Sequence, residues 1–110
     1  MKTTYRKIAE SQDIFRKLSE IPLNIADAER LKQGILELDK FYGEIDELRS
    51  EFLREPLPSR TKEEFEKDFN DFLNKEIELK KFPLDLSGES IIITALDLIR
   101  LGNLVNFKGL

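Results

Sequence analysis

The sequence predicts a mainly α-helical protein of the α+β class: an antiparallel helical hairpin plus a third helix, with a small two-stranded β element and a short C-terminal helix. Three observations predict this fold. Apolar residues recur every three or four positions through three long segments, prolines stand in both breaks between those segments, and the apolar spacing shortens to two after Asn74. A chain of 110 residues can build one hydrophobic core, so we expect a single domain over residues 1–110.

The first predicted helix covers about residues 4–20, and the second covers about residues 25–53. The hydroxyl of Thr3 or Thr4 is a suitable N-cap for the first helix. Pro22 ends that helix, because the residue before a proline is disfavoured in helical geometry. The connection between the two helices is short, so we expect them to be antiparallel neighbours.

Asn24 is the expected N-cap of the 25–53 helix, whose apolar seam is longer than the first helix can cover. The seam consists of Leu31, Ile35, Leu38, Tyr42, Ile45, Arg49 and Phe52. Either the third helix or a second copy of the chain covers the rest of it. Arg49 either reaches a carboxylate over the core or sets the register of a partner helix. Gly34 and Gly43 each cost a helix about 1 kcal/mol, which indicates close packing or a bend, with a functional hinge as the alternative.

The third helix, at about 61–74, leads directly into a strand at about 76–80. Thr61 and Glu64 have the spacing of a capping box at its start. Its apolar face consists of Phe65, Phe69, Phe72 and Leu73. Apolar and charged residues alternate immediately afterwards, which is the pattern of a half-buried strand. A helix and a strand in direct succession are expected to share one core.

We expect the 76–80 strand to pair with a second strand at about 91–93, where three consecutive isoleucines stand. An isolated two-stranded ribbon is marginal in water, so another element has to cover it. The sequence therefore predicts that Phe65, Phe69 and Phe72 pack between this small sheet and the 25–53 helix.

The last predicted helix covers about residues 95–101, with Thr94 as its N-cap. We expect its four apolar residues to pack it against the rest of the chain; they are Leu96, Leu98, Ile99 and Leu101. The tail after this helix is apolar and contains Leu104, Val105 and Phe107. It either folds back onto the chain or meets a partner.

Composition narrows the possible chemistry. The chain has no His, no Cys and no Trp, so it lacks the best proton-transfer group near neutral pH, a thiolate nucleophile and the usual zinc ligands. Carboxylates one helical turn apart could hold a hard cation or act as an acid–base pair. These pairs are Glu44 with Glu47 and Asp68 with Asp71. Lys or Arg flanks each pair, which favours a solvated helix face, so we expect no enzyme, no cofactor and no metal site.

Charge and hydropathy limit the kinds of partner that the chain is expected to bind. The net charge is −4, from 22 acidic and 18 basic residues with the signs interleaved, which argues against nucleic-acid binding. Lys80 and Lys81 beside a strand are expected to protect its edge from pairing with other chains. No apolar run approaches the roughly 20 residues of a membrane span, and the N-terminus has no signal-peptide pattern. We therefore expect a cytoplasmic protein without a membrane partner.

Residues 61–101 carry a succession of motifs that resembles a family of small uncharacterised proteins encoded by tailed bacteriophages. The matching residues are Phe69, Asn70, Phe72, Leu73, Asn74, Glu76, Ile77, Glu78 and Leu79, followed by Pro83, Leu84, Leu86, Ile91, Ile93, Thr94, Asp97 and Leu98. The first half of the chain resembles the family only in its helical pattern. The resemblance implies a viral origin, hence a host cytoplasm, and a helical body with a small β element. It implies no catalytic residues.

The functional expectation is a small phage-type accessory protein that binds a host, defence or viral protein without catalysis. The residues expected to contact the partner are Phe41, Leu48, Arg49, Phe52, Leu104 and Phe107. The alternative is a self-assembling component of a phage particle or of its assembly, with a homo-oligomer formed through the 25–53 helix.

Overall fold

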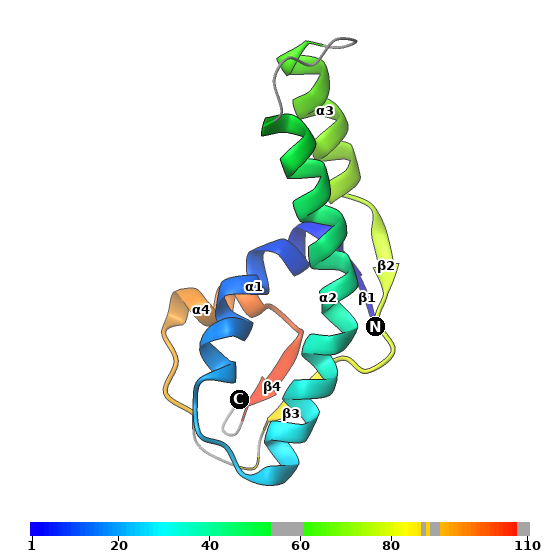
Figure 1. The fold of residues 1–110 in the computed structure, drawn as a ribbon. Helices are drawn as coiled ribbons and strands as arrows, with labels where there is room; N and C mark the ends of the chain where they lie inside the picture. Colours follow the sequence, from blue (N-terminus) through cyan, green and yellow to red (C-terminus); the bar gives the residue numbers. More distant parts are fainter. Residues whose placement is uncertain (54–60, 87, 89–90, 108–110) are drawn as a thin grey trace.

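The computed structural model describes residues 1–53, 61–86, 88 and 91–107, with the side chains of Phe52 and Leu53 outside the described part. Its elements in chain order are β1 (Lys2–Thr4), α1 (Tyr5–Ser19), α2 (Ile25–Leu53), α3 (Lys62–Leu73), β2 (Glu76–Glu78), β3 (Leu84–Leu86), α4 (Ala95–Leu101) and β4 (Val105–Phe107). The predicted mainly α fold with a small β element is confirmed. The molecule is elongated, 51 × 25 × 23 Å, because α2 runs along most of its length (Figure 1).

Helices α1 and α2 form the predicted antiparallel hairpin (Figure 1). The Thr4 hydroxyl accepts a hydrogen bond from the Lys7 backbone N–H at 3.3 Å, so Thr4 is the N-cap of α1. The Asn24 side chain accepts from the Asp27 N–H at 2.9 Å at the start of α2. Helix α3 begins with the predicted capping box at Thr61. All these starts depend on local hydrogen bonds, which explains why the sequence locates them well.

The strand pairing differs from the prediction. Strand β2 pairs antiparallel with β1 at the N-terminus, with Ile77 opposite Thr3. The predicted strand at 91–93 is wrong, because those residues form no strand and belong to neither sheet. The N-terminus fits this edge of the sheet well: the Leu79 N–H donates to the Met1 carbonyl at 2.7 Å, and the Met1 ammonium donates to the Leu79 carbonyl at 2.8 Å.

A second strand pair joins β3 to β4 in parallel, with Leu84 opposite Val105 and Leu86 opposite Phe107. The apolar tail therefore folds back onto its own chain, which is one of the two alternatives left open by the sequence. This pair lies between α1 and α2 in Figure 1, and α4 packs on the other side of α1. The core gathers residues from all of these elements, including Ile8, Phe15, Leu18, Leu38, Leu86, Leu101 and Leu104.

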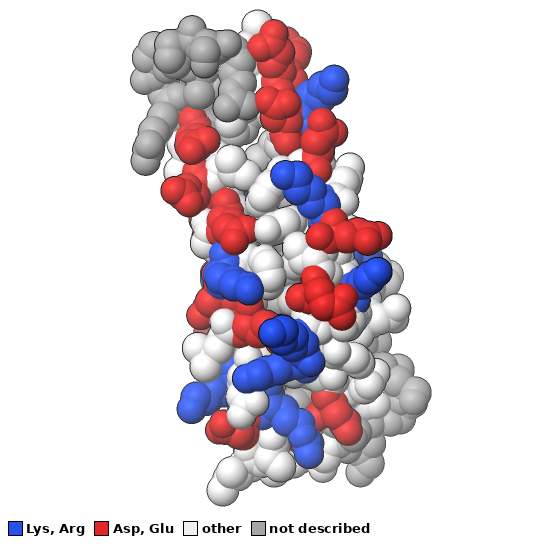
Figure 2. All heavy atoms as spheres, turned by 90° about the vertical axis from the view of Figure 1, so that its right-hand side faces the viewer, with Lys and Arg blue, Asp and Glu red and all other residues white. Residues whose placement is uncertain are grey.

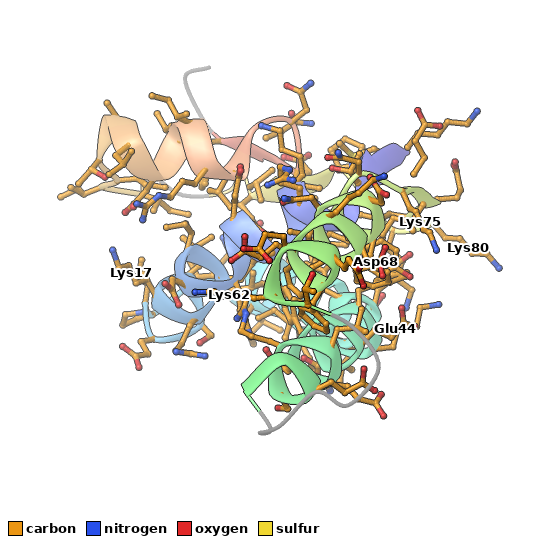
Figure 3. The ribbon with its side chains drawn as sticks, turned by 90° about the horizontal axis from the view of Figure 1, so that it is seen from above. Lys17, Glu44, Lys62, Asp68, Lys75 and Lys80 are labelled. Carbon is orange, nitrogen blue, oxygen red and sulfur yellow. The ribbon has the colours of Figure 1, made fainter. Side chains whose placement is uncertain are left out.

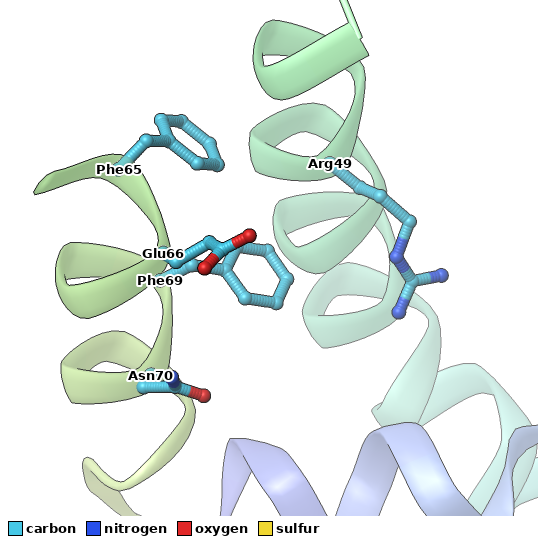
Figure 4. A pocket seen from close by; sticks show the side chains of 5 residues that line it. All are labelled: Arg49, Phe65, Glu66, Phe69 and Asn70. Atoms are coloured by element: carbon cyan, nitrogen blue, oxygen red, sulfur yellow. The ribbon is translucent and has the colours of Figure 1, made fainter. Parts of the chain in front are cut away.

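Helix α3 lies beside the C-terminal part of α2, away from the main core (Figures 1 and 4). The prediction that Phe65, Phe69 and Phe72 fill the space between a small sheet and α2 is wrong. The Phe72 ring instead contacts the Tyr5 ring of α1, with 4.2 Å between centroids. Phe69 is only partly buried, with its ring 6.2 Å from that of Phe65. Strand β1 takes the place beside β2 that was expected for the 91–93 strand. Tyr5 follows β1 directly, which brings its ring against Phe72.

The two glycines inside α2 have different surroundings. A Cβ at Gly34 would lie 2.6 Å from a methyl carbon of Leu84, so α2 and β3 approach each other closely there. A Cβ at Gly43 would meet nothing within 4 Å. Close packing is therefore confirmed for Gly34 and does not apply to Gly43.

Candidate protein-binding site

The six residues expected to contact a partner do not form one surface. Leu104 and Phe107 are 2% and 9% exposed, because β4 is part of the core. Phe41 is also buried, with its ring 5.7 Å from that of Tyr5. These three assignments are corrected: the chain covers the side chains itself. The prediction failed because the parallel β3–β4 pairing, which depends on tertiary structure, removes the tail from the surface.

The remaining three of the six are Leu48, which is half-buried, Arg49, which is exposed, and Phe52, which lies outside the described side chains. Arg49 lines a hollow of about 260 Å³ together with Phe65, Glu66, Phe69 and Asn70 of α3. Figure 4 shows the Phe65 and Phe69 rings turned toward α2, while the Arg49 side chain extends away from them. Its guanidinium lies 3.7 Å from the Asp46 carboxylate one turn earlier. Such an exposed pair contributes little, so Arg49 reaches a carboxylate without forming a strong site.

The seam of α2 is mostly covered by the same chain. Leu31, Leu38, Tyr42 and Ile45 are all buried. The seam therefore does not present its apolar residues to a second copy. The Tyr42 hydroxyl has no hydrogen-bond partner among the described residues, and the nearby Ser11 hydroxyl donates to the Ile8 carbonyl at 2.8 Å. Burial above all, and the Asp39 carboxylate more weakly, raise the pKa of Tyr42 to about 12, against an opposing effect of Ser11.

The carboxylate pairs show no assembled chemical site. Glu44 accepts a hydrogen bond from the Tyr5 hydroxyl, and burial followed by this bond raises the pKa of Tyr5 to about 12. Glu47, Asp68 and Asp71 are exposed on the helix surfaces. Among the described residues, no three carboxylates come close enough together to hold a metal ion.

An exposed apolar surface lies elsewhere, on the outside of α4. Ile92, Leu96 and Ile99 are 99%, 54% and 69% exposed, and we call these three residues the α4 patch. The expectation that Leu96 and Ile99 pack α4 against the chain is wrong: Asp97 and Leu101 are the buried residues of this helix. Leu96 and Ile99 stand at i and i+3 on one face of α4, so the sequence did carry a signal for these two residues, whereas Ile92 lies in the segment before the helix.

Local contacts hold α4 in place behind this patch. The Thr94 hydroxyl accepts from the Asp97 N–H at 3.1 Å and caps the helix. The Lys17 ammonium of α1 lies 3.6 Å from the Asp97 carboxylate, whose side chain is only 11% exposed. Leu101 is 1% exposed and anchors the end of α4 in the core. The patch is thus presented on a supported helix.

Comparison of the chain with protein-family models, with curated proteins and with solved structures produced no match. Within the described ranges, no helix combines the length and the apolar character that crossing a membrane requires. The residues and their geometry are therefore the basis for proposing a function.

Proposed function

We propose that this chain is a non-enzymatic accessory protein that acts by binding another protein through the α4 patch. The observation that carries the proposal is the exposure of three large aliphatic side chains: Leu96 and Ile99 on one face of α4, and Ile92 in the segment directly before it. Burying apolar surface against a partner stabilises the complex by about 25 cal/mol for each Å² that is removed from water. Contiguous apolar residues on a supported helix are typical of protein-interaction sites.

Composition supports a binding role over catalysis. The chain has no His and no Cys, so acid–base and nucleophilic catalysis near neutral pH would depend on carboxylates and lysines. Tyr5 and Tyr42 have clearly raised pKa values, and both shifts keep a phenol protonated. Neither phenol is thereby prepared to act as a base.

The resemblance of residues 61–101 to the phage-encoded family supports a viral accessory role in a host cytoplasm. The partner is then a host enzyme, a defence component or a virion protein. Each of these is a protein surface that an aliphatic patch can join. The alternative function, a self-assembling component of a particle, needs a surface other than the buried part of the α2 seam, which is Leu31, Leu38, Tyr42 and Ile45.

Protein capture with matched variants tests the proposal. Tagged wild-type chain and an Ile92→Ser/Leu96→Gln/Ile99→Gln variant are incubated with host lysates, infected and uninfected. We expect a partner that the wild type enriches and the triple variant loses. All three side chains are exposed, so the variant is expected to keep its fold, which a thermal melt followed by circular dichroism verifies.

The control is Ile25→Gln, which removes another exposed aliphatic side chain, 89% exposed, from the start of α2. This variant is expected to capture the partner as well as the wild type does. A partner retained equally by the triple variant, or no enriched protein in either lysate, contradicts binding through α4.

A further inference from the structure

A basic hollow of about 370 Å³ lies beside the middle of α2. Its lining residues are Gln33, Leu36, Glu37, Lys40, Glu78, Lys80 and Lys81. Both carboxylates are already engaged: Glu37 accepts the backbone N–H groups of Lys80 and Lys81 at 2.5 and 2.9 Å, and Glu78 pairs with the N-terminal ammonium at 3.0 Å. Among the described residues, none of the three lysine ammonium groups has a carboxylate within ion-pair distance. The three lysines outnumber the two carboxylates of the hollow, and the N-terminal ammonium neutralises one of those carboxylates, so the hollow carries an excess of positive charge.

The same face becomes acidic farther along the molecule. Helical periodicity places Lys40, Glu44, Glu47 and Glu51 in one row of α2. Figure 3 shows Glu44, Asp68 and Lys80 on the same side of the molecule. Figure 2, which views this side directly, shows acidic side chains gathered over its upper part and a basic cluster below. Some basic side chains lie among the acidic ones and some acidic ones beside the basic cluster, so the two signs are partly separated on this face. In the α2 row the change of sign falls between Lys40 and Glu44.

We infer that this face associates with the same face of a second copy in an antiparallel dimer. A two-fold axis that crosses α2 between Lys40 and Glu44, perpendicular to the helix, sets the basic half of each copy against the acidic half of the other. Every ion pair then forms twice, and the assembly ends at two copies because each copy uses the same surface. A parallel arrangement would oppose like charges, which is unfavourable. Leu36, which is 60% exposed beside the lysines, adds apolar area to the contact.

The proposed dimer forms through a different surface from the α4 patch. Helix α4 lies on the left of Figure 1, whereas the charged face is its right-hand side. A dimer formed in this way leaves the α4 patch free. Each copy also carries a net charge of −4, so the long-range force between copies is repulsive and only the local pairs attract.

Sedimentation equilibrium on the full chain, up to hundreds of micromolar, gives the first test. We expect a dimer at an ionic strength of about 0.1 M, where charges act over about 10 Å, and monomers at about 1 M, where they act over about 3 Å. A chain that is monomeric at both ionic strengths overturns the inference. So does a dimer of equal strength at both.

Two charge-reversal variants give the decisive test. Lys80→Glu/Lys81→Glu reverses two of the three lysines of the hollow and leaves Lys40, and Glu47→Lys/Glu51→Lys reverses two of the three carboxylates in the α2 row and leaves Glu44. Each variant alone should raise the dimer dissociation constant at least about tenfold, because an exposed pair is worth a factor of about 1.5 to 5 and symmetry doubles every pair. An equimolar mixture should restore the dimer, since each variant then meets the opposite charge.

Lys62→Glu/Arg100→Glu is the control, because it reverses two exposed charges at the start of α3 and on α4, and it should dimerise as the wild type does. A mixture of the two charge-reversal variants that stays monomeric overturns the antiparallel arrangement. Capture of a partner through α4 should be unchanged in the two charge-reversal variants of this face, so failure of the dimer and failure of the proposed function are separately visible.

Discussion

Replacing Gly34 or Gly43 by Ala makes the same chemical change at two positions of the same helix. In an exposed helix interior this change stabilises a protein by about 1 kcal/mol, because alanine loses less backbone entropy on folding. Both glycines lie well inside α2, so both variants should gain this amount. Any difference between them reports what the new methyl group meets in the folded chain.

At Gly43 the methyl group meets nothing within 4 Å, so Gly43→Ala should stabilise the protein by about 1 kcal/mol. At Gly34 it would lie 2.6 and 2.9 Å from the two methyl carbons of Leu84 and 3.1 Å from Cγ. Leu84 is 4% exposed in β3, so its side chain has little room to move. Overpacking of this kind costs about 1–3 kcal/mol, so Gly34→Ala should be neutral to destabilising by about 2 kcal/mol.

Urea unfolding followed by far-ultraviolet circular dichroism measures both variants under the same conditions. The predicted difference in unfolding free energy is about 1–3 kcal/mol, with Gly43→Ala the more stable. Adding Leu84→Ala to each variant should remove most of that difference, because the shortened side chain leaves space at Gly34. If the two glycine variants were stabilised equally, the close contact between α2 and β3 would be refuted.

Three further predictions use the same unfolding measurement. Tyr42→Phe should be neutral or stabilising by about 1 kcal/mol, because it removes a buried hydroxyl without a partner among the described residues. A clear loss of stability would show that the Tyr42 hydroxyl is hydrogen-bonded in the folded protein. Between about pH 10 and about pH 12 the unfolded chain loses phenol protons that Tyr5 and Tyr42 keep in the folded state, so the unfolding free energy should fall as the pH rises. The fall should be less steep in Tyr42→Phe. Equal slopes in the two proteins would contradict the raised pKa of Tyr42. Phe15→Ala should lower the unfolding free energy by about 3–5 kcal/mol, because Phe15 is 1% exposed. Phe69→Ala should lower it clearly less, because the Phe69 ring is only partly buried. Equal losses would show that α3 belongs to the main core.

Predictions from the sequence succeeded where the deciding interactions are local. The capping box at Thr61 and the caps at Asn24 and Thr94 each join residues three positions apart, so their signatures are readable without knowing the fold. Helix ends came within two residues for the same reason. Leu96 and Ile99 of the α4 patch also had a local signal, but an apolar row on a helix does not say whether other elements cover it.

The amino-acid sequence by itself determined the fold class, the helices and the chemistry that the side chains can offer, because these depend on periodicity, caps and composition. Tertiary structure alone decided the strand partners and the surfaces. Strand β2 pairs with β1, and the paired residues are more than 70 positions apart in the sequence. Strand β4 pairs with β3, which brings Phe107 into the core. Backbone hydrogen bonds between strands carry no sequence code for a distant partner. Which apolar residues remain exposed, and which charges gather on one face, therefore followed only from packing.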